Sequence, residues 1–376
     1  MEVYLDNAAT TRVCTEAADI AYKVMTECYG NPSSTHTKGR EAKTYLDAAR
    51  AQIAKALGCA VTEVYFTSCG SESDVWAITK GAESMSRRGK HIISSAVEHD
   101  AVRKTLADLE ARGYEVTYLK PEQDGSISVQ AVKNALRSDT VLVTLMMVNN
   151  ETGGVTDIAG IAKMLKAEGS KALLHTDAVQ GFMKLPFSAK KLGADMISIS
   201  GHKIHAPKGI GALYIKTGVK IKPLIHGGAQ ESGLRAGTEA MPQIAAFGKA
   251  AEIAFAGMKK NCEKIAKLRE SAASAICAEM PEAVIIGGGA PHILSVSLPG
   301  WRSEVLMNFL EAKGIFVSRS SACKKGGRSH VLEAMGLSAP IIDGAIRISF
   351  SRMNTQDDVD ALVSALKEAH DTLAHR

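Results

Sequence analysis

Lys203 lies in a run of small and polar residues, 200–209, that directly follows an apolar stretch typical of a buried strand. A lysine in this position is a poor surface residue, because the strand before it leads into the protein interior. Partial burial disfavours the charged ammonium, lowers the pKa of the amine and makes the amine a nucleophile. The sequence therefore predicts that Lys203 can form a Schiff base with a carbonyl compound.

Further polar clusters follow other strand-like stretches, at residues 68–73, 97–99, 149–154 and 175–180. Each has an ordinary structural explanation. Residues 68–73 are typical of a strand–helix turn. A single histidine at a strand end, here His99, is usually structural. The adjacent Gly153 and Gly154 form turns easily. Asp177 could cap a helix, although burial of an Asp is costly unless a cation lies beside it.

Taken together, these clusters supply the groups that pyridoxal phosphate (PLP) requires. Asp177 can hold a pyridinium N–H, and the His99 ring can stack on the cofactor ring. The small residues at 68–73 precede a helix, whose free N–H groups suit a phosphate. Ligands of open parallel sheets bind beyond the carboxyl ends of the strands, which is where these clusters are expected.

The order of the predicted elements indicates the fold class. Short apolar stretches alternate with helical patterns, which is typical of an α/β protein with a mainly parallel sheet, here of seven strands, flanked by helices. The expected strands are 64–67, 91–94, 115–119, 141–148, 172–176, 196–200 and 212–215, and the clearest helices are 40–57, 100–112 and 157–167.

The pattern changes after residue 244, where a long helical stretch runs to Met280 and is followed by short strands near 293–298 and 346–350. A last helix is expected after Thr355, which can serve as its N-cap. The length of 376 residues also favours more than one domain. We expect a large PLP-binding domain over 12–244 and a smaller α/β domain over 245–376, with 1–11 packed on the smaller one.

Composition excludes several function classes. The net charge is +5 with scattered basic residues, so no direct nucleic-acid partner is expected. The longest apolar stretch, 141–148, is too short to span a membrane. The N-terminal residues lack the basic and apolar regions of a signal peptide, so we expect a cytoplasmic protein.

The seven cysteines are spaced irregularly, with neither a C-x-x-C motif nor a nearby histidine partner. Free thiols and no metal site are therefore expected. Most of these thiols should be inert, and one or two at most should be reactive.

Ordered motifs along essentially the whole chain resemble those of the cysteine desulfurases, the NifS/IscS-like enzymes of the class V aminotransferase family. The motifs lie at residues 4–11, 30–34, 66–72, 149–151, 177–180, 200–203, 227–231, 235–238 and 320–323. The resemblance implies a PLP-dependent homodimer that takes sulfur from L-cysteine, leaves L-alanine and passes the sulfur to an acceptor protein.

The resemblance also implies a role for individual residues. Lys203 would carry the cofactor and act as a base, Asp177 would bind the pyridine nitrogen, and His99 would stack on the ring. The remaining implied cofactor contacts are Asn150 and Gln180 near the phenolic oxygen, and Gly70, Ser71, Ser200, His202 and the partner subunit's Thr238 at the phosphate. Arg347, with Asn150, would bind the substrate carboxylate.

Cys323 would determine the reaction. It is surrounded by small residues and followed by Lys324, Lys325 and Arg328, and nearby positive charge favours a thiolate. Without the other motifs, a basic loop with an incidental cysteine would be the simpler interpretation. With them, the resemblance implies that Cys323 receives the sulfur as a persulfide.

The sequence departs from the family pattern in places. Cys69 stands where glycine is usual, and we interpret it as a small buried thiol. Ser71 replaces a frequent threonine but keeps the hydroxyl. The segment after Cys323 is short and carries Lys324 and Lys325, which leaves the acceptor open between iron–sulfur cluster assembly and tRNA or cofactor thiolation.

Other functions remain possible on these motifs, because a fold hosts more than one reaction. The chain could be a selenocysteine lyase or an aminotransferase, both of which would use the same cofactor. It could also be a non-catalytic scaffold of a sulfur-transfer complex, although a scaffold would need neither Lys203 nor Cys323.

Overall fold

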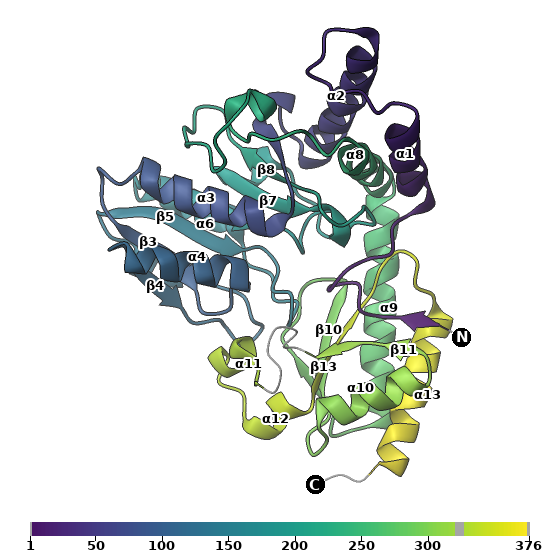
Figure 1. The fold of residues 1–376 in the computed structure, drawn as a ribbon. Helices are drawn as coiled ribbons and strands as arrows, with labels where there is room; N and C mark the ends of the chain where they lie inside the picture. Colours follow the sequence, from purple (N-terminus) through teal and green to yellow (C-terminus); the bar gives the residue numbers. More distant parts are fainter. Residues whose placement is uncertain (1, 320–326, 374–376) are drawn as a thin grey trace.

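A computed structural model describes residues 2–319 and 327–373 of the chain. Two layered units are visible, one around a large sheet and one around a smaller sheet near both chain ends (Figure 1). Each unit has its own buried apolar core, as expected for a chain of this length.

The large sheet has seven strands in the order β2-β8-β7-β6-β5-β3-β4. Their bounds are β2 Val64–Thr67, β3 His91–Ser95, β4 Glu115–Leu119, β5 Thr140–Met146, β6 Leu173–Asp177, β7 Met196–Ser200 and β8 Gly211–Ile215. Strands β4, β3, β5, β6 and β7 pair in parallel, whereas β8 runs antiparallel to both of its neighbours. The predicted mainly parallel sheet is confirmed.

Helices cover both faces of this sheet, which explains why its strands β5 and β7 are buried along their whole length. On one face, α3 and α4 pack through Trp76 and Leu106. On the other, α2, α6 and α8 share a core with Ile53 and Phe247. The helices of this unit are α1 Thr15–Thr26, α2 Thr37–Leu57, α3 Gly70–Ser84, α4 Asp100–Ala111, α5 Val129–Ala135, α6 Ile158–Ala167, α7 Ala189–Leu192 and α8 Met241–Ala256, with short 3-10 turns η1 Val61–Glu63, η2 Gly201–Lys203 and η3 Gln230–Gly233.

The smaller unit is built on an antiparallel sheet of four strands in the order β12-β13-β10-β9 and a parallel pair, β1 with β11. The strands are β1 Val3–Tyr4, β9 Val284–Ile286, β10 Ile293–Ser297, β11 Ile315–Phe316, β12 Ser318–Arg319 and β13 Ala345–Ser349. Its helices are α9 Met258–Glu279, α10 Ser303–Ala312, α11 His330–Ala334, α12 Ala339–Asp343 and α13 Gln356–Thr372. The predicted N-cap is present at Thr355, whose backbone N–H donates to Asp358 Oδ2 at 3.0 Å.

The long helix expected to run to Met280 is in fact two helices, α8 and α9, separated at Gly257 (φ −96°, ψ 4°). Glycine is a poor interior helix residue, which explains the interruption. Helix α8 packs into the large core and α9 into the small one. We therefore propose that the domains divide at Gly257 rather than at residue 244.

The N-terminal segment connects the two units. Val3 and Leu5 are buried in the small core, and Asp6 forms a parallel bridge with Ser349. A few residues further on, the backbone N–H of Thr11 donates to the carbonyl of His202 at 2.9 Å. The segment thus leads from β13 directly to the residues that follow β7.

Among residues 2–319 and 327–373, no helix combines the length and apolar character needed to cross a bilayer. Within the same ranges, no group of three or more His, Cys, Asp or Glu side chains is arranged to hold a metal ion.

Helices α2 and α8 cross closely at Gly248, where an added Cβ would lie 2.6 Å from the Cα of Ala49. Because that atom belongs to the backbone, it cannot move aside. We expect Gly248→Val to lower the free energy of unfolding by about 1–3 kcal/mol through overpacking. Lys249→Val, at a half-exposed position of the same helix, should change it little. Urea denaturation of both variants measures this difference, and equal midpoints would contradict the close crossing.

Candidate active site

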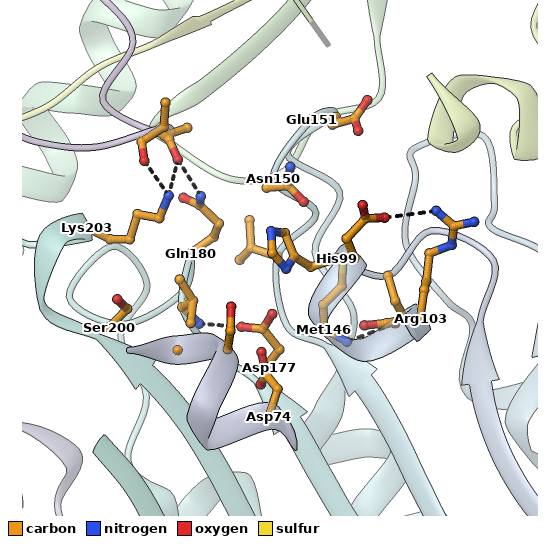
Figure 2. Close-up of a pocket in the computed structure, with 18 of the residues that line it drawn as sticks. Asp74, His99, Arg103, Met146, Asn150, Glu151, Asp177, Gln180, Ser200 and Lys203 are labelled. Carbon is orange, nitrogen blue, oxygen red and sulfur yellow. Dashed lines mark hydrogen bonds and ion pairs between the residues drawn. The ribbon is translucent and has the colours of Figure 1, made fainter. Parts of the chain in front are cut away.

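The carboxyl ends of β5, β6 and β7 carry Met146, Asp177 and Ser200, and all three residues line one cavity of ≈ 360 Å³. Figure 2 shows side chains from the loops after these strands converging on it. This is the position at which parallel sheets bind ligands.

Lys203 follows β7 and points into the cavity (Figure 2). Its Nζ donates to the carbonyl oxygens of Ala8 and Ala9, each at 2.7 Å. Burial is the main cause that lowers the pKa of the amine to about 8, and the Arg347 cation contributes, while Asp177 acts in the opposite direction. A neutral, nucleophilic amine is therefore accessible near neutral pH.

Asp177 ends β6 and is buried, and its Oδ1 accepts the backbone N–H of Val179 at 2.8 Å. Burial raises the pKa of this carboxyl, whereas His99, the N–H of Val179 and Lys203 lower it. His99 precedes α4, and its Nδ1 accepts the backbone N–H of Ala101 at 3.1 Å. That contact makes Nδ1 the acceptor and leaves Nε2 to carry the proton of a neutral ring.

Helix α3 begins at Gly70, and an added Cβ there would lie 2.7 Å from Val179 Cγ2 and 3.4 Å from Ser200 Cβ. Only glycine permits this close approach. The buried hydroxyl of Ser200 has no hydrogen-bond partner within the described part of the chain. Ser71 lies in the first turn of α3, whose free N–H groups also lack intrahelical partners. An unsatisfied hydroxyl beside a helix N-terminus fits a phosphate group.

His202, expected at the phosphate, lies beside Lys203 in the cavity wall. Burial lowers its pKa to about 4, with Lys203 and Lys208 contributing, so the ring is neutral at physiological pH. Its Nδ1 lies 3.2 Å from Thr10 Oγ1. The His202 ring can therefore contribute a hydrogen bond to the cavity, but no charge.

Arg347, on β13, brings the smaller unit to the cavity and is only 2% exposed. Its Nη1 donates to the carbonyl of Asn150 at 2.8 Å, and its Nη2 donates to Asp6 Oδ1 at 2.9 Å. Gln180 lies nearby, where its Nε2 donates to the carbonyl of Ala8 at 2.8 Å. Arg347 and Asn150, the two residues expected at the substrate carboxylate, are therefore neighbours in space.

The residues present fit PLP. Asp177 could hold the ring nitrogen, Lys203 could bind the aldehyde carbon, and Ser200 with the start of α3 could hold the phosphate. The His99 ring lines the same cavity (Figure 2). An acid and an amine buried together beside the N-terminus of a helix are the groups that a PLP-dependent enzyme requires.

Two of the expected residues are not placed in this cavity. Thr238 lines a separate pocket, together with Phe66 and Arg235. Cys323 lies outside the described residues. Arg328 and His330, which follow it in sequence, do line the cavity.

Three buried carboxyls of the cavity wall received no role from sequence reasoning: Asp74, Glu98 and Glu151. Burial raises the pKa of all three, Glu98 to about 8 and Glu151 to about 7. Asp177 raises the pKa of Asp74 further. In sequence, Glu98 adjoins His99, Glu151 adjoins Asn150, and Asp74 lies one helical turn after Gly70. These positions alone do not separate the three acids from ordinary surface acids. Only the structure does so, because it buries them in the cavity wall.

The chain resembles known proteins over nearly its full length. The aminotransferase class V family model matches residues 3–362. Cysteine desulfurase IscS of Methanosarcina thermophila is 43% identical over 97% of this chain and 91% of the relative. A solved structure of a NifS-like protein has a TM-score of 0.94 at 38% identity, covering 99% of this chain and all of the other. SspA, solved in complex with cysteine, has a TM-score of 0.83 at 34% identity, covering 94% and 99%.

The chain therefore belongs to the class V aminotransferase family of PLP-dependent enzymes and, within it, to the cysteine desulfurases. The family inferred from the sequence motifs is confirmed. The prediction of PLP as the cofactor is confirmed as well, because this family depends on PLP.

The pKa of Lys203 predicts how cofactor capture by the apoenzyme depends on pH. Because the neutral amine is the reactive form, the rate of PLP binding should rise with pH through a midpoint of about 8. Stopped-flow absorbance of the apoenzyme mixed with PLP measures it. A midpoint near the usual lysine value of 10.5 would show instead that the amine is solvated.

Proposed function

We propose that this chain removes sulfur from L-cysteine, leaving L-alanine and a persulfide on Cys323. The observation that carries the proposal is the cavity in which the buried amine of Lys203, the carboxylate of Asp177 and the guanidinium of Arg347 converge. The similarity to cysteine desulfurases and to SspA, which was solved with bound cysteine, supports the same substrate.

The protein groups have complementary tasks. PLP, when bound, supplies an electron sink for negative charge that develops at the substrate α-carbon. Lys203, with a pKa of about 8, can be neutral and accept the α-proton at its Nζ. Arg347 and Asn150 bind the substrate carboxylate and fix the orientation of the α-carbon. The protonated Nε2 of His99 is available to hold or donate a proton.

The sulfur step belongs to Cys323. Its thiolate attacks the substrate sulfur, the bond between that sulfur and the β-carbon breaks, and the electron pair stays on carbon, which then takes up a proton. The balance is L-cysteine plus a protein thiol giving L-alanine plus a protein persulfide. Positive charge on Lys324 and Lys325, which directly follow Cys323 in sequence, favours the thiolate that begins the step. The charge of Arg328 is instead paired with Asp343.

We further propose a homodimer with shared sites. In a single chain, Thr238 lies in a pocket apart from Lys203, so Thr238 of the partner subunit would complete the phosphate site. The sulfur acceptor would be a protein of iron–sulfur cluster assembly or of tRNA or cofactor thiolation, in the cytoplasm.

One assay separates the alternative functions. The purified holoenzyme is given L-cysteine and a reductant, and alanine and sulfide are quantified. Equal amounts of both support the desulfurase. A keto-acid-dependent product would indicate an aminotransferase, a strong preference for selenocysteine in direct competition would indicate a selenocysteine lyase, and failure to bind PLP would indicate a scaffold.

Cys323→Ser should abolish alanine and persulfide formation, because the hydroxyl cannot accept sulfur, and should leave the cofactor absorbance unchanged. Cys277→Ser is the matched control, since Cys277 is an exposed free thiol on α9. We expect the control to keep the parent rate of alanine formation. Parent activity in the Cys323→Ser variant would show that another group receives the sulfur.

A further inference from the structure

The guanidinium of Arg347 forms an ion pair with the carboxylate of Asp6 at 2.9 Å. We propose that Asp6 is a positioning residue for substrate recognition: its contact with Arg347 presents the guanidinium to the carboxylate of an α-amino acid. The inference rests on the proposed function in that it takes the Arg347 guanidinium as the group that binds this carboxylate.

The guanidinium of Arg347 is held from two directions. Nη1 donates to the carbonyl of Asn150, on the large domain, and Nη2 donates to the carboxylate of Asp6, on the N-terminal segment. A guanidinium is planar, so two contacts at different nitrogens set both its position and its plane. The remaining N–H groups are then available to a carboxylate in the cavity that Arg347 lines.

The charges support the same role. The Arg347 side chain is 3% exposed, and the Asp6 side chain is 22% exposed. A buried cation without a counter-charge is costly, so the pair keeps the guanidinium stable when the cavity holds no substrate. Asp6 is not among the described residues that line the cavity, so its carboxylate can hold the guanidinium without itself facing the substrate.

The Asp6 backbone is anchored independently of this ion pair. The backbone N–H of Ser349 donates to the carbonyl of Leu5 at 2.6 Å, and that of Ala8 donates to Ser349 Oγ at 2.8 Å. The side chain of Asn7 adds a bond from Nδ2 to the carbonyl of Ser349 at 2.9 Å. Replacing the Asp6 carboxylate by an amide should therefore leave the segment, and with it the carbonyls of Ala8 and Ala9 that hold Lys203, in place.

If Asp6 acts through Arg347, it should affect the binding only of substrates that carry a carboxylate. Cysteamine has the amine and thiol of cysteine without the carboxylate. Its binding would still depend on Lys203 and Asp177, but not on Arg347. A comparison of the two amines thus separates orientation of the guanidinium from any general effect on the cavity, including a change in the pKa of Lys203, to which Asp6 contributes.

The test uses the PLP-loaded full chain in the Cys323→Ser background, in which sulfur removal is blocked. Dissociation constants for L-cysteine and for cysteamine are measured from the change in cofactor absorbance, with and without Asp6→Asn. Asp19→Asn, an exposed acid on α1, is the charge-matched control. In the active background, KM and kcat for L-cysteine are measured as well.

We expect Asp6→Asn to weaken L-cysteine binding about tenfold or more, the effect of a lost charge-assisted contact, and to raise KM accordingly. The affinity for cysteamine and the absorbance of the resting enzyme should stay unchanged, as should all values for Asp19→Asn. Equal losses for both amines would overturn the proposal in favour of a general role in folding the cavity. Unchanged L-cysteine binding would overturn it outright.

Failure of the proposed function has a different signature. A parent enzyme that forms neither alanine nor sulfide from L-cysteine would refute the desulfurase. The comparison of L-cysteine with cysteamine would still decide the role of Asp6, because it measures binding alone.

Discussion

Burial of the Lys203 amine is the constraint on which the rest of the site depends. A buried amine needs acceptors, and here they are the backbone carbonyls of Ala8 and Ala9, at 2.7 Å each. Backbone acceptors bring no negative charge, so they stabilise the amine without restoring the pKa of a solvated lysine. The pKa of Lys203 is about 8, which keeps the amine available both as a nucleophile and as a base.

This arrangement ties the chemistry to the N-terminal segment. Ala8, whose carbonyl accepts from Lys203 and Gln180, lies two residues after Asp6, which bridges to β13. Leu5, just before Asp6, is buried in the small core. Asp6, between these two attachments, contacts Arg347. One short stretch of backbone therefore contacts both the amine and the guanidinium, and the same stretch is attached to the small core through Leu5.

The carboxyls around the cavity are distinguished by their neighbours. Asp177 is near His99 and Lys203, which lower its pKa against the effect of burial. Asp74 lies 3.7 Å from His175, but burial lowers the pKa of that imidazole to about 3, so Asp74 gains no cationic partner there. Negative charge is thus favoured on Asp177 rather than on the acids behind it, which is where a protonated pyridine nitrogen needs it.

Local patterns in the sequence were sufficient for the strands of the large sheet, the N-cap at Thr355 and the polar clusters after β5, β6 and β7, because strand periodicity, capping and turn chemistry depend on residues near one another. The interruption at Gly257 could not be decided from the glycine alone, because Gly248 lies inside α8 without breaking it. Packing of α8 and α9 against different cores supplies the other part of the reason. Nor could local patterns place Asp6, which is 341 residues from Arg347, or the carbonyls that receive Lys203, 194 and 195 residues away. Side-chain type predicts which chemistry is possible, but burial, pKa and orientation arise from contacts between distant segments, and these exist only in the folded chain.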